Sequence, residues 1–234
     1  MIPRKIHYCW FGRAQKPRLA IRCIESWKKF CPDFEIIEWN EDNFDVNQNA
    51  YSRYCYENKK WAFLSDYVRL AVVAKYGGVY FDTDVEAVRN IDDLLNYDAF
   101  YGFENENCVN TGLGFGSVAG HAVISQMLAQ YESKKPNENG AYPLVGCPAL
   151  NTAALDSFGL VHNGELQNVA GAEILPADYL NPYDDATGRL NKTANTVSIH
   201  WYSKSALSKW KIWRSRLTRP LHRLLGKDFF ARFR

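Results

Sequence analysis

The sequence predicts an α/β protein, a single domain in which helices flank a mostly parallel central sheet. Two observations support this prediction. Short β-branched and aromatic runs alternate with helical periodicity from residue 5 to residue 133, as expected for strands and helices that build a parallel sheet. The chain of 234 residues can also bury one substantial core, and its 47% hydrophobic content excludes a disordered protein.

The elements are expected in a regular order. A helix over 17–30 has apolar residues at every third or fourth position, and two helices over 51–60 and 61–75 follow a polar loop. Gly77 and Gly78 stop the last of these helices, because glycine tolerates the left-handed conformation that closes a helix. The expected strands, each rich in β-branched or aromatic residues, are 5–10, 35–39, 79–85 and 99–104, and the remaining helical segments are 92–95 and 122–133.

An acidic pair, Asp82 and Asp84, follows the helix stop in the segment Y-G-G-V-Y-F-D-T-D. Side chains alternate between the faces of a strand, so Tyr80, Asp82 and Asp84 are expected on one face. Two neighbouring carboxylates repel each other without a partner, and Mn²⁺ or Mg²⁺ would supply that partner and hold a diphosphate. The alternative is an exposed acidic turn. The apolar strand and the helix stop favour a metal–diphosphate site.

Other positions also point to ligand binding. In parallel α/β sheets ligands bind beyond the carboxyl ends of the strands, which is where Trp10, Asn40 and Asp84 fall. The glycine-rich segment 110–120 lacks the Lys-Ser/Thr ending of a phosphate-binding loop. We expect this segment to approach the substrate closely instead.

Charge is unevenly distributed along the chain. Residues 209–234 contain nine Lys/Arg and one acid, whereas residues 1–208 contain 19 basic and 25 acidic residues, a net charge of −6. Tryptophan and leucine recur at helical spacing in the tail, which predicts a basic amphipathic helix that binds an anionic membrane surface. A helix packed on the protein is the alternative, and the acidic main body argues against nucleic acid as a partner. The expected divisions are a domain over 1–205 and a tail over 206–234.

Cysteine usage and hydropathy bear on location. The six cysteines form no C-x-x-C pair, which favours free thiols in a reducing compartment over disulfides or a zinc site. No apolar run is long enough to cross a bilayer, and the first ten residues lack the pattern of a signal peptide. We therefore expect a cytoplasmic protein, bound peripherally to the cytoplasmic face of the membrane.

Three segments carry a resemblance to a known family. They read I-P-R-K-I-H-Y-C-W-F-G at 2–12, C-I-E-S-W-K-K-F-C-P-D-F-E-I-I-E-W-N at 23–40 and S-D-Y-V-R-L-A-V-V-A-K-Y-G-G-V-Y-F-D-T-D-V-E at 65–86. In this order they resemble the capsular-polysaccharide glycosyltransferases of family 32, which implies a GT-A fold with a DxD sugar-binding region. The segment N-T-V-S-I-H-W-Y-S-K-S at 195–205 is similar to the family's closing block, although Trp201 and Ala206 depart from the common pattern.

The resemblance implies how a nucleotide-sugar donor would be bound. Trp10 would stack on the nucleotide base, and Asn40 would contact the phosphate or the ribose. Ser65, Asp66 and Arg69 lie on one helix, and the last two would bind hydroxyls of the donor sugar. A structural ion pair between Asp66 and Arg69 is the alternative.

The resemblance also implies roles around the metal. Tyr80 would flank the donor. Asp84 would contact the metal directly, and Asp82 would bind ribose, sugar or a metal-bound water. His200 would be a third metal ligand, since Mn²⁺ accepts nitrogen as well as oxygen, or else a hydrogen-bonded histidine in the last strand.

The expected function is metal-dependent, retaining transfer of a hexose from a nucleotide-sugar, with a UDP-sugar favoured, to a glycan or lipid-linked acceptor. Surface or capsular polysaccharide synthesis is the expected setting. Two alternatives use the same acidic pair. One is a nucleotidyl- or phosphoryl-transferase, which would release pyrophosphate or phosphate. The other is a nucleotide-sugar binder without turnover.

Overall fold

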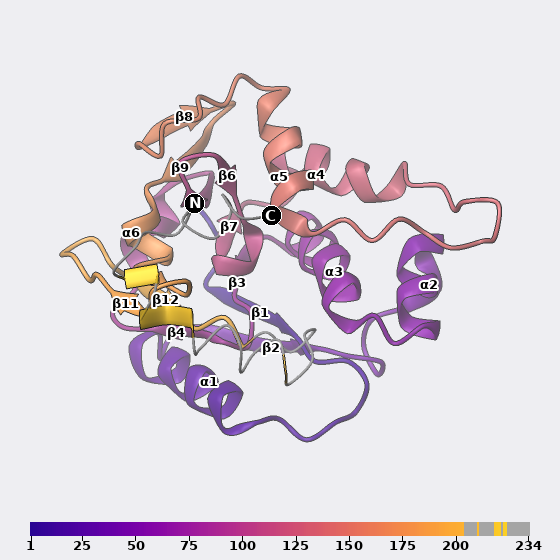
Figure 1. Cartoon of the computed structure of the whole chain (residues 1–234), viewed down its shortest axis with the longest axis horizontal. Helices are drawn as coiled ribbons and strands as arrows, with labels where there is room; N and C mark the ends of the chain where they lie inside the picture. The colour runs from indigo at the N-terminus through magenta and orange to yellow at the C-terminus, as the bar shows by residue number, and fades with distance from the viewer. Residues whose placement is uncertain (204–209, 211–217, 221, 224–234) are drawn as a thin grey trace.

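A central sheet of eight strands organises the computed structural model (Figure 1), which describes residues 1–203, 210, 218–220, 222 and 223. The strands of this sheet are β1 (Lys5–Cys9), β2 (Glu35–Trp39), β3 (Gly78–Tyr80), β5 (Ala99–Asn105), β6 (Cys108–Val109), β7 (Phe115–Ser117), β8 (Gln167–Val169) and β9 (Ala172–Leu175). Two smaller sheets pair β4 (Val85–Ala87) with β12 (Ser198–His200), and β10 (Tyr183–Asp184) with β11 (Arg189–Leu190).

Strand order in the central sheet is β2-β1-β3-β7-β5-β9-β8, with β6 paired to β5. Strand β1 is parallel to β2 and β3, and β5 is parallel to β9. Strand β7 runs antiparallel between β3 and β5, so β3 and β5 point the same way. Five of the eight strands therefore share one direction, which confirms the predicted α/β class with a mostly parallel sheet.

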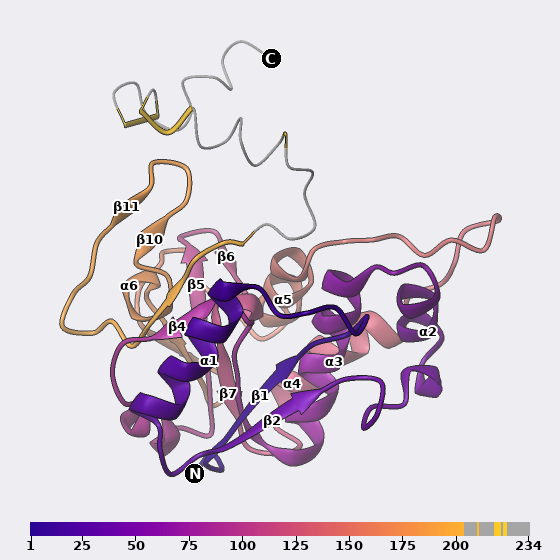
Figure 2. The same ribbon diagram turned by 90° about the horizontal axis from the view of Figure 1, so that it is seen from below.

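Helices cover both faces of the sheet. They are α1 (Arg18–Phe30), α2 (Ala50–Glu57), α3 (Trp61–Tyr76), α4 (Ala122–Glu132), α5 (Cys147–Asp156) and α6 (Ala177–Leu180), with short 3₁₀ turns η1 (Val46–Gln48), η2 (Asp92–Asn96) and η3 (Thr111–Leu113). Figure 2 shows α1 and β4 on one side of the sheet and α3, α4 and α5 on the other. Among the described residues, no helix combines the length and the hydrophobicity needed to span a bilayer.

The strands divide their side chains between two cores. On β5, Tyr101 and Phe103 pack with α3, α4 and α5, whereas Phe100 packs with α1 and the small β4–β12 sheet. This alternation follows from the two-residue period of a strand, and it explains why strands covered on both faces are apolar throughout. All six cysteines are free thiols, as predicted, and five of them are buried.

Helix α3 ends where the two glycines predicted it would. Gly77 has φ +63°, and its N–H donates to the carbonyl of Val73 at 2.9 Å. Gly78 has φ +115°, and a Cβ atom there would lie 2.8 Å from Nε2 of the buried His7. Both positions therefore require glycine, and the chain passes directly from α3 into the central sheet.

The prediction of one strand over residues 79–85 is wrong. Strand β3 ends at Tyr80, a turn follows, and β4 starts at Val85, whose N–H donates to the carbonyl of Asp82 at 2.9 Å. The chain leaves the central sheet here because β4 pairs with β12 instead. The acidic pair therefore lies on a turn between two sheets, and strand alternation does not place its side chains.

The rest of the sequence-based assignment agrees with the structure to within a few residues at the element ends, with two additions. The glycine-rich segment 110–120 contains η3 and strand β7. Several elements between residues 134 and 195 were not predicted. The predicted amphipathic tail lies largely outside the described residues, so its helix and the division at residue 205 stay predictions.

Trp27 of α1 connects this helix to the acidic turn. Its side chain is fully buried between the rings of Tyr8 and Phe81, and its Nε1 donates to the carbonyl of Val85 at 2.8 Å. The indole thus fixes the start of β4, directly after the acidic pair.

We expect Trp27→Ala to lower the free energy of unfolding by about 3–5 kcal/mol, because it leaves a large cavity and an unpaired carbonyl. Ile21→Ala on the exposed side of the same helix is the control, since Ile21 is 49% exposed, and it should change stability by less than about 0.5 kcal/mol. Urea unfolding followed by circular dichroism measures both variants. Equal losses would contradict the anchoring role of Trp27.

Candidate functional site

Three side chains with metal-binding atoms meet beside the acidic turn. One ligand atom from each of Asp82, Asp84 and His200 lies within 4.8 Å of the others. The two aspartates come from the turn between β3 and β4, and His200 ends β12, opposite Val85 in the β4–β12 pair. Pairing of β4 with β12 therefore brings together residues more than a hundred positions apart in the sequence.

Asp84 is bound from the side of β12. Its Oδ1 lies 3.2 Å from Nε2 of His200, and its Oδ2 accepts the N–H of Ser203 at 2.7 Å. Burial alone would raise the pKa of Asp84 and lower the pKa of His200. Their mutual attraction outweighs burial, so the pKa of Asp84 lies below its usual value and that of His200 lies above.

Asp82 is bound from the side of α3. Nη2 of Arg69 lies 3.0 and 3.1 Å from the two carboxylate oxygens of Asp82, and the hydroxyl of Tyr80 donates to Oδ1 at 3.0 Å. The same Nη2 lies 3.0 Å from Oδ1 of Asp66, and the Arg69 side chain is only 3% exposed. Burial raises the pKa of Asp66 to about 6, although Arg69 opposes this shift. The ion pair that was one alternative for Asp66 and Arg69 is therefore present.

The three residues fit a hard divalent cation. Carboxylate oxygens and an imidazole nitrogen suit Mn²⁺ or Mg²⁺. Both carboxylates are already engaged, Asp82 by Arg69 and Tyr80 and Asp84 by His200 and the Ser203 amide. Because His200 is itself a candidate ligand, a shared cation would replace its contact with Asp84, which makes Asp84 the more available carboxylate. Nδ1 of His200 is buried without a hydrogen-bond partner among the described residues. The described residues thus supply no second partner for this imidazole, and binding a cation would require His200 to lose its proton.

A cavity of about 330 Å³ opens beside this cluster. Sequence-predicted residues that line it are Trp10, Ser65, Asp66, Arg69, Asp82, Asp84 and His200. Its size is within the range of small-molecule sites, about 300–1,000 Å³. The structure thus brings seven of the nine predicted site residues to one cavity.

Trp10 reaches the cavity from the carboxyl end of β1. Its Nε1 donates to the carbonyl of Ala14 at 2.6 Å, and Nζ of Lys16 lies 5.6 Å from the ring centroid. The indole is therefore oriented by its own loop and keeps a partly exposed ring.

Two predicted residues do not line the cavity. Tyr80 is 1% exposed and contributes through its hydrogen bond to Asp82. Asn40 turns away, because its Oδ1 accepts the N–H of Asp42 and its Nδ2 donates to Glu38. The geometry gives the predicted donor contact of Asn40 no support.

Sequence reasoning missed several lining residues. Asn110 and Gly112 belong to the glycine-rich segment, and a Cβ atom on Gly112 would lie 2.9 Å from Oδ1 of Asn110 and 3.0 Å from Oδ2 of Asp82. Gly112 thus packs closely against Asp82, and the expected approach of this segment to the substrate stays a prediction. Cys147 begins α5 and places its sulfur 3.8 Å from Nη1 of Arg69, and no local pattern in the sequence marks it.

Comparison with known proteins agrees with this geometry. Residues 17–101 match the family described as "Glycosyltransferase sugar-binding region containing DXD motif". The match covers 85 of the 234 residues, about a third of this chain. The matched segment includes α3, β3 and the acidic turn, and the predicted DxD glycosyltransferase region is thereby confirmed.

Two curated relatives are similar over parts of their length. "Inositol phosphoceramide mannosyltransferase 3" of Schizosaccharomyces pombe is 26% identical over 135 residues, which are 54% of this chain and 36% of that protein. "Subversion of eukaryotic traffic protein A" of Legionella pneumophila is 24% identical over 111 residues, 36% of this chain and 17% of that protein. The chain thus matches about a third or less of either relative's length.

A solved structure shares the fold. The "PaToxG Glycosyltransferase" superposes with a TM-score of 0.52 at 18% identity, covering 67% of this chain and 69% of that chain. This likeness agrees with the GT-A-like architecture predicted from the sequence.

Cation binding can be measured directly on the full chain. We expect Asp84→Asn to weaken Mn²⁺ binding by more than the roughly 10–100-fold typical of changes next to a metal's ligands. Asp82→Asn should have a smaller effect, because Arg69 and Tyr80 occupy that carboxylate. Mn²⁺ titration followed by electron paramagnetic resonance gives the affinities. Asp93→Asn, on a carboxylate that is 86% exposed, is the matched control. Wild-type affinity in Asp84→Asn would exclude a cation at this cluster.

His200→Gln separates the two interpretations of the histidine. If His200 is a ligand, we expect Mn²⁺ affinity to fall at least about tenfold while the protein stays folded. Unchanged Mn²⁺ affinity would establish His200 as a structural partner of Asp84.

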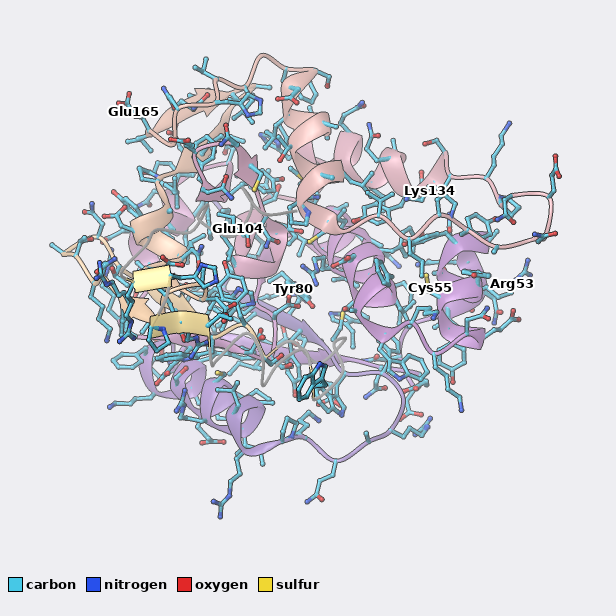
Figure 3. All side chains as sticks on the ribbon, in the orientation of Figure 1. Arg53, Cys55, Tyr80, Glu104, Lys134 and Glu165 are labelled. Carbon is cyan, nitrogen blue, oxygen red and sulfur yellow. The ribbon has the colours of Figure 1, made fainter. Side chains whose placement is uncertain are left out.

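Arg69 is expected to stabilise the buried carboxylates of Asp66 and Asp82. Arg69→Met leaves Asp66 and Asp82 without their shared cation and should lower the free energy of unfolding by about 3–5 kcal/mol. Adding Asp66→Asn should recover part of this loss, since one buried carboxylate is then removed. Arg53→Met is the control, because Arg53 is exposed on α2 at the edge of the molecule (Figure 3). Thermal and urea unfolding give the values, and a loss equal to that of the control would refute the arrangement.

Proposed function

We propose that the protein is a metal-dependent, retaining glycosyltransferase that moves a hexose from a nucleotide-sugar to a glycan or lipid-linked acceptor. The observation that carries this proposal is the cluster of Asp82, Asp84 and His200 on the wall of a cavity large enough for a small ligand. The match of this same segment to a DXD sugar-binding region supports it. A role in surface or capsular polysaccharide synthesis is proposed from the resemblance to family 32.

The donor would occupy this cavity with its diphosphate toward Asp84 and His200. A divalent cation, when bound there, would offset the negative charge that develops on the leaving diphosphate. Trp10 offers its partly exposed ring to the nucleotide base at the other end of the cavity, and a UDP-sugar is the favoured donor. Because the protein groups are already oriented by neighbours, they would lose little freedom when the donor binds.

The sugar would lie against α3. Arg69 lines the cavity, and its Nη2 is occupied by Asp66 and Asp82, whereas its Nη1 contacts only the Cys147 sulfur, at 3.8 Å, among the hydrogen bonds and ion pairs of the described residues. Nη1 is therefore the group of Arg69 that we propose for hydrogen bonding to a sugar hydroxyl. Ser65 lines the cavity one turn earlier on the same helix.

Retention of the anomeric configuration is proposed without a protein nucleophile. The carboxylate of Asp82 is bound by Arg69 and Tyr80, and that of Asp84 by His200 and the Ser203 amide. Carboxylates held in this way are poor nucleophiles. Attack of the acceptor hydroxyl on the face that the diphosphate leaves is the route we favour, and the hydroxyl proton would pass to that leaving group.

A panel of nucleotide-sugars with Mn²⁺ or Mg²⁺ tests the reaction class. We expect slow hydrolysis of one donor, with release of a nucleoside diphosphate, and loss of this activity on chelation of the metal. Asp84→Asn should lower the rate by about 10²–10³-fold, as expected when one group that stabilises developing charge is removed. Chromatography of the products distinguishes the alternatives. Pyrophosphate would indicate a nucleotidyl-transferase, and binding without any product would indicate a non-catalytic binder.

Attachment to an anionic membrane through residues 209–234 is proposed for access to a lipid-linked acceptor on the cytoplasmic face. Two of the nine basic side chains of this tail bind the protein itself. Arg219 pairs with Asp185 at 2.9 Å, and Arg223 donates to the carbonyl of Thr187 at 2.6 Å. The other seven lie outside the described residues. These two contacts hold Arg219 and Arg223 at the β10–β11 hairpin, as the packed alternative expects, and membrane contact is proposed for the other seven cations.

A charge-reversal variant of the full chain tests this attachment. Lys209→Glu, Lys211→Glu and Arg214→Glu combined should abolish sedimentation with phosphatidylserine vesicles at low salt, because each cation contributes about 1 kcal/mol near an anionic surface. The control reverses three exposed charges on the main body, Arg53, Lys59 and Lys135. Wild-type protein should be released by high salt. Vesicle binding that survives in the tail variant would exclude the tail as the membrane contact.

A further inference from the structure

A second cavity, of about 580 Å³, lies next to the metal-binding cluster and is not used by the donor site proposed above. It is bounded by the carboxyl end of β5, by α6 and by the β10–β11 hairpin. Its lining includes Glu104, Asn181 and Tyr183, and also Tyr202, which follows β12. The hairpin stands out from the body of the protein in Figures 1 and 2.

A short wall separates the two cavities. The ring of Tyr202 lies 4.1 Å from the ring of His200, centroid to centroid, and its hydroxyl lies 3.0 Å from both Oε1 of Glu104 and Oδ1 of Asn181. Oε2 of Glu104 accepts from Nδ2 of Asn110 at 3.3 Å, and Asn110 lines the donor cavity. Figure 3 labels Glu104, which lies near the middle of that view. The second cavity thus begins one side chain away from the cation site.

Tyr202 is held in this wall at a conformational cost. Its φ of +48° is in the left-handed region, which is unfavourable for a residue with a side chain. Contacts with His200, Glu104 and Asn181 offset this cost. Specific contacts therefore fix Tyr202 in its position between the two cavities.

The charge of the second cavity excludes the donor and indicates a different ligand. Four carboxylates line it, those of Glu104, Asp178, Asp184 and Asp185. None of the described residues that line it is Lys or Arg, and Arg219 forms an ion pair with Asp185, which leaves the cavity an excess of negative charge among the described residues. An anionic nucleotide diphosphate would be repelled there. Carboxylates and the Asn181 amide are suited to the hydroxyl groups of a neutral ligand, and tyrosine rings offer apolar faces to the C–H side of a sugar.

We propose that this second cavity binds the acceptor, as the hydroxyl-rich end of a neutral glycan, and that Glu104 accepts a hydrogen bond from it. The inference rests on the proposed glycosyltransferase function and adds to it the position and the chemistry of the acceptor site. An acceptor seated here would approach the donor past Tyr202, on the side of the cation cluster formed by His200.

Filling the cavity tests the proposal on the full chain. Ala186 lines the second cavity and not the first, so Ala186→Phe should reduce the space available to a sugar. Ala129→Phe adds the same bulk to an exposed position on α4 and is the control. The probes are the methyl α-glycosides of glucose, galactose and mannose, with binding measured by saturation-transfer-difference NMR. UDP binding with Mn²⁺ is measured in parallel.

We expect wild-type protein and Ala129→Phe to bind at least one methyl glycoside, and Ala186→Phe to lose at least about tenfold in that affinity while UDP affinity is unchanged. Glu104→Gln keeps the size of the side chain and should weaken glycoside binding by about 10–100-fold, as expected for loss of a charged hydrogen-bond partner. If Ala186→Phe does not fold, judged by its melting curve, Glu104→Gln decides alone.

Three results would overturn the proposal: no glycoside binding by wild-type protein, unchanged glycoside binding in the folded variants, or equal losses of glycoside and UDP binding. The donor-hydrolysis assay separates this outcome from the proposed function. Donor hydrolysis without glycoside binding refutes only the acceptor cavity. Glycoside binding without hydrolysis of any donor refutes the transferase and leaves a carbohydrate-binding cavity.

Discussion

Crowding of negative charge is the constraint on which this site depends. Asp66, Asp82 and Asp84 all line the cavity proposed for the donor, where burial makes each charge costly. Arg69 on α3 offsets the negative charge of Asp66 and Asp82, and His200 on β12 offsets that of Asp84. The acidic turn can therefore persist as a folded structure before any cation or donor arrives.

This electrostatic arrangement depends on chain topology. After Tyr80 the chain leaves the central sheet, and β4 forms its own pair with β12. The pair carries His200 to Asp84, and the residues after it donate the Ser203 amide and the Tyr202 ring. One strand pair thus completes the proposed cation site and also builds the wall of the second cavity. A change in the register of β12 would affect both.

The fold class and most elements could be predicted because their signals are local. The glycine stop after α3 is a backbone requirement at Gly77, and β2 is marked by the strand-favouring residues Ile36, Ile37 and Trp39. The prediction of a single strand over 79–85 was wrong because the alternation of apolar residues continues across the turn. Val79, Phe81 and Val85 all enter one core although they belong to different sheets or to the turn. The alternation of apolar residues indicates which side chains are buried. It does not indicate which strand each segment pairs with.

By itself, the sequence determined the α/β class, the helix stop, the acidic pair and the resemblance to a DxD sugar-binding region, since each is encoded within a few neighbouring residues. Tertiary structure alone decided that Arg69 pairs with Asp82 as well as Asp66, that Asn40 turns away, and that Asn110 and Cys147 line the cavity beside the acidic turn. It also decided the existence of the second cavity. These features arise from contacts between residues far apart in the chain, whose distances depend on how the sheets pair and how the helices pack, and no local pattern records them.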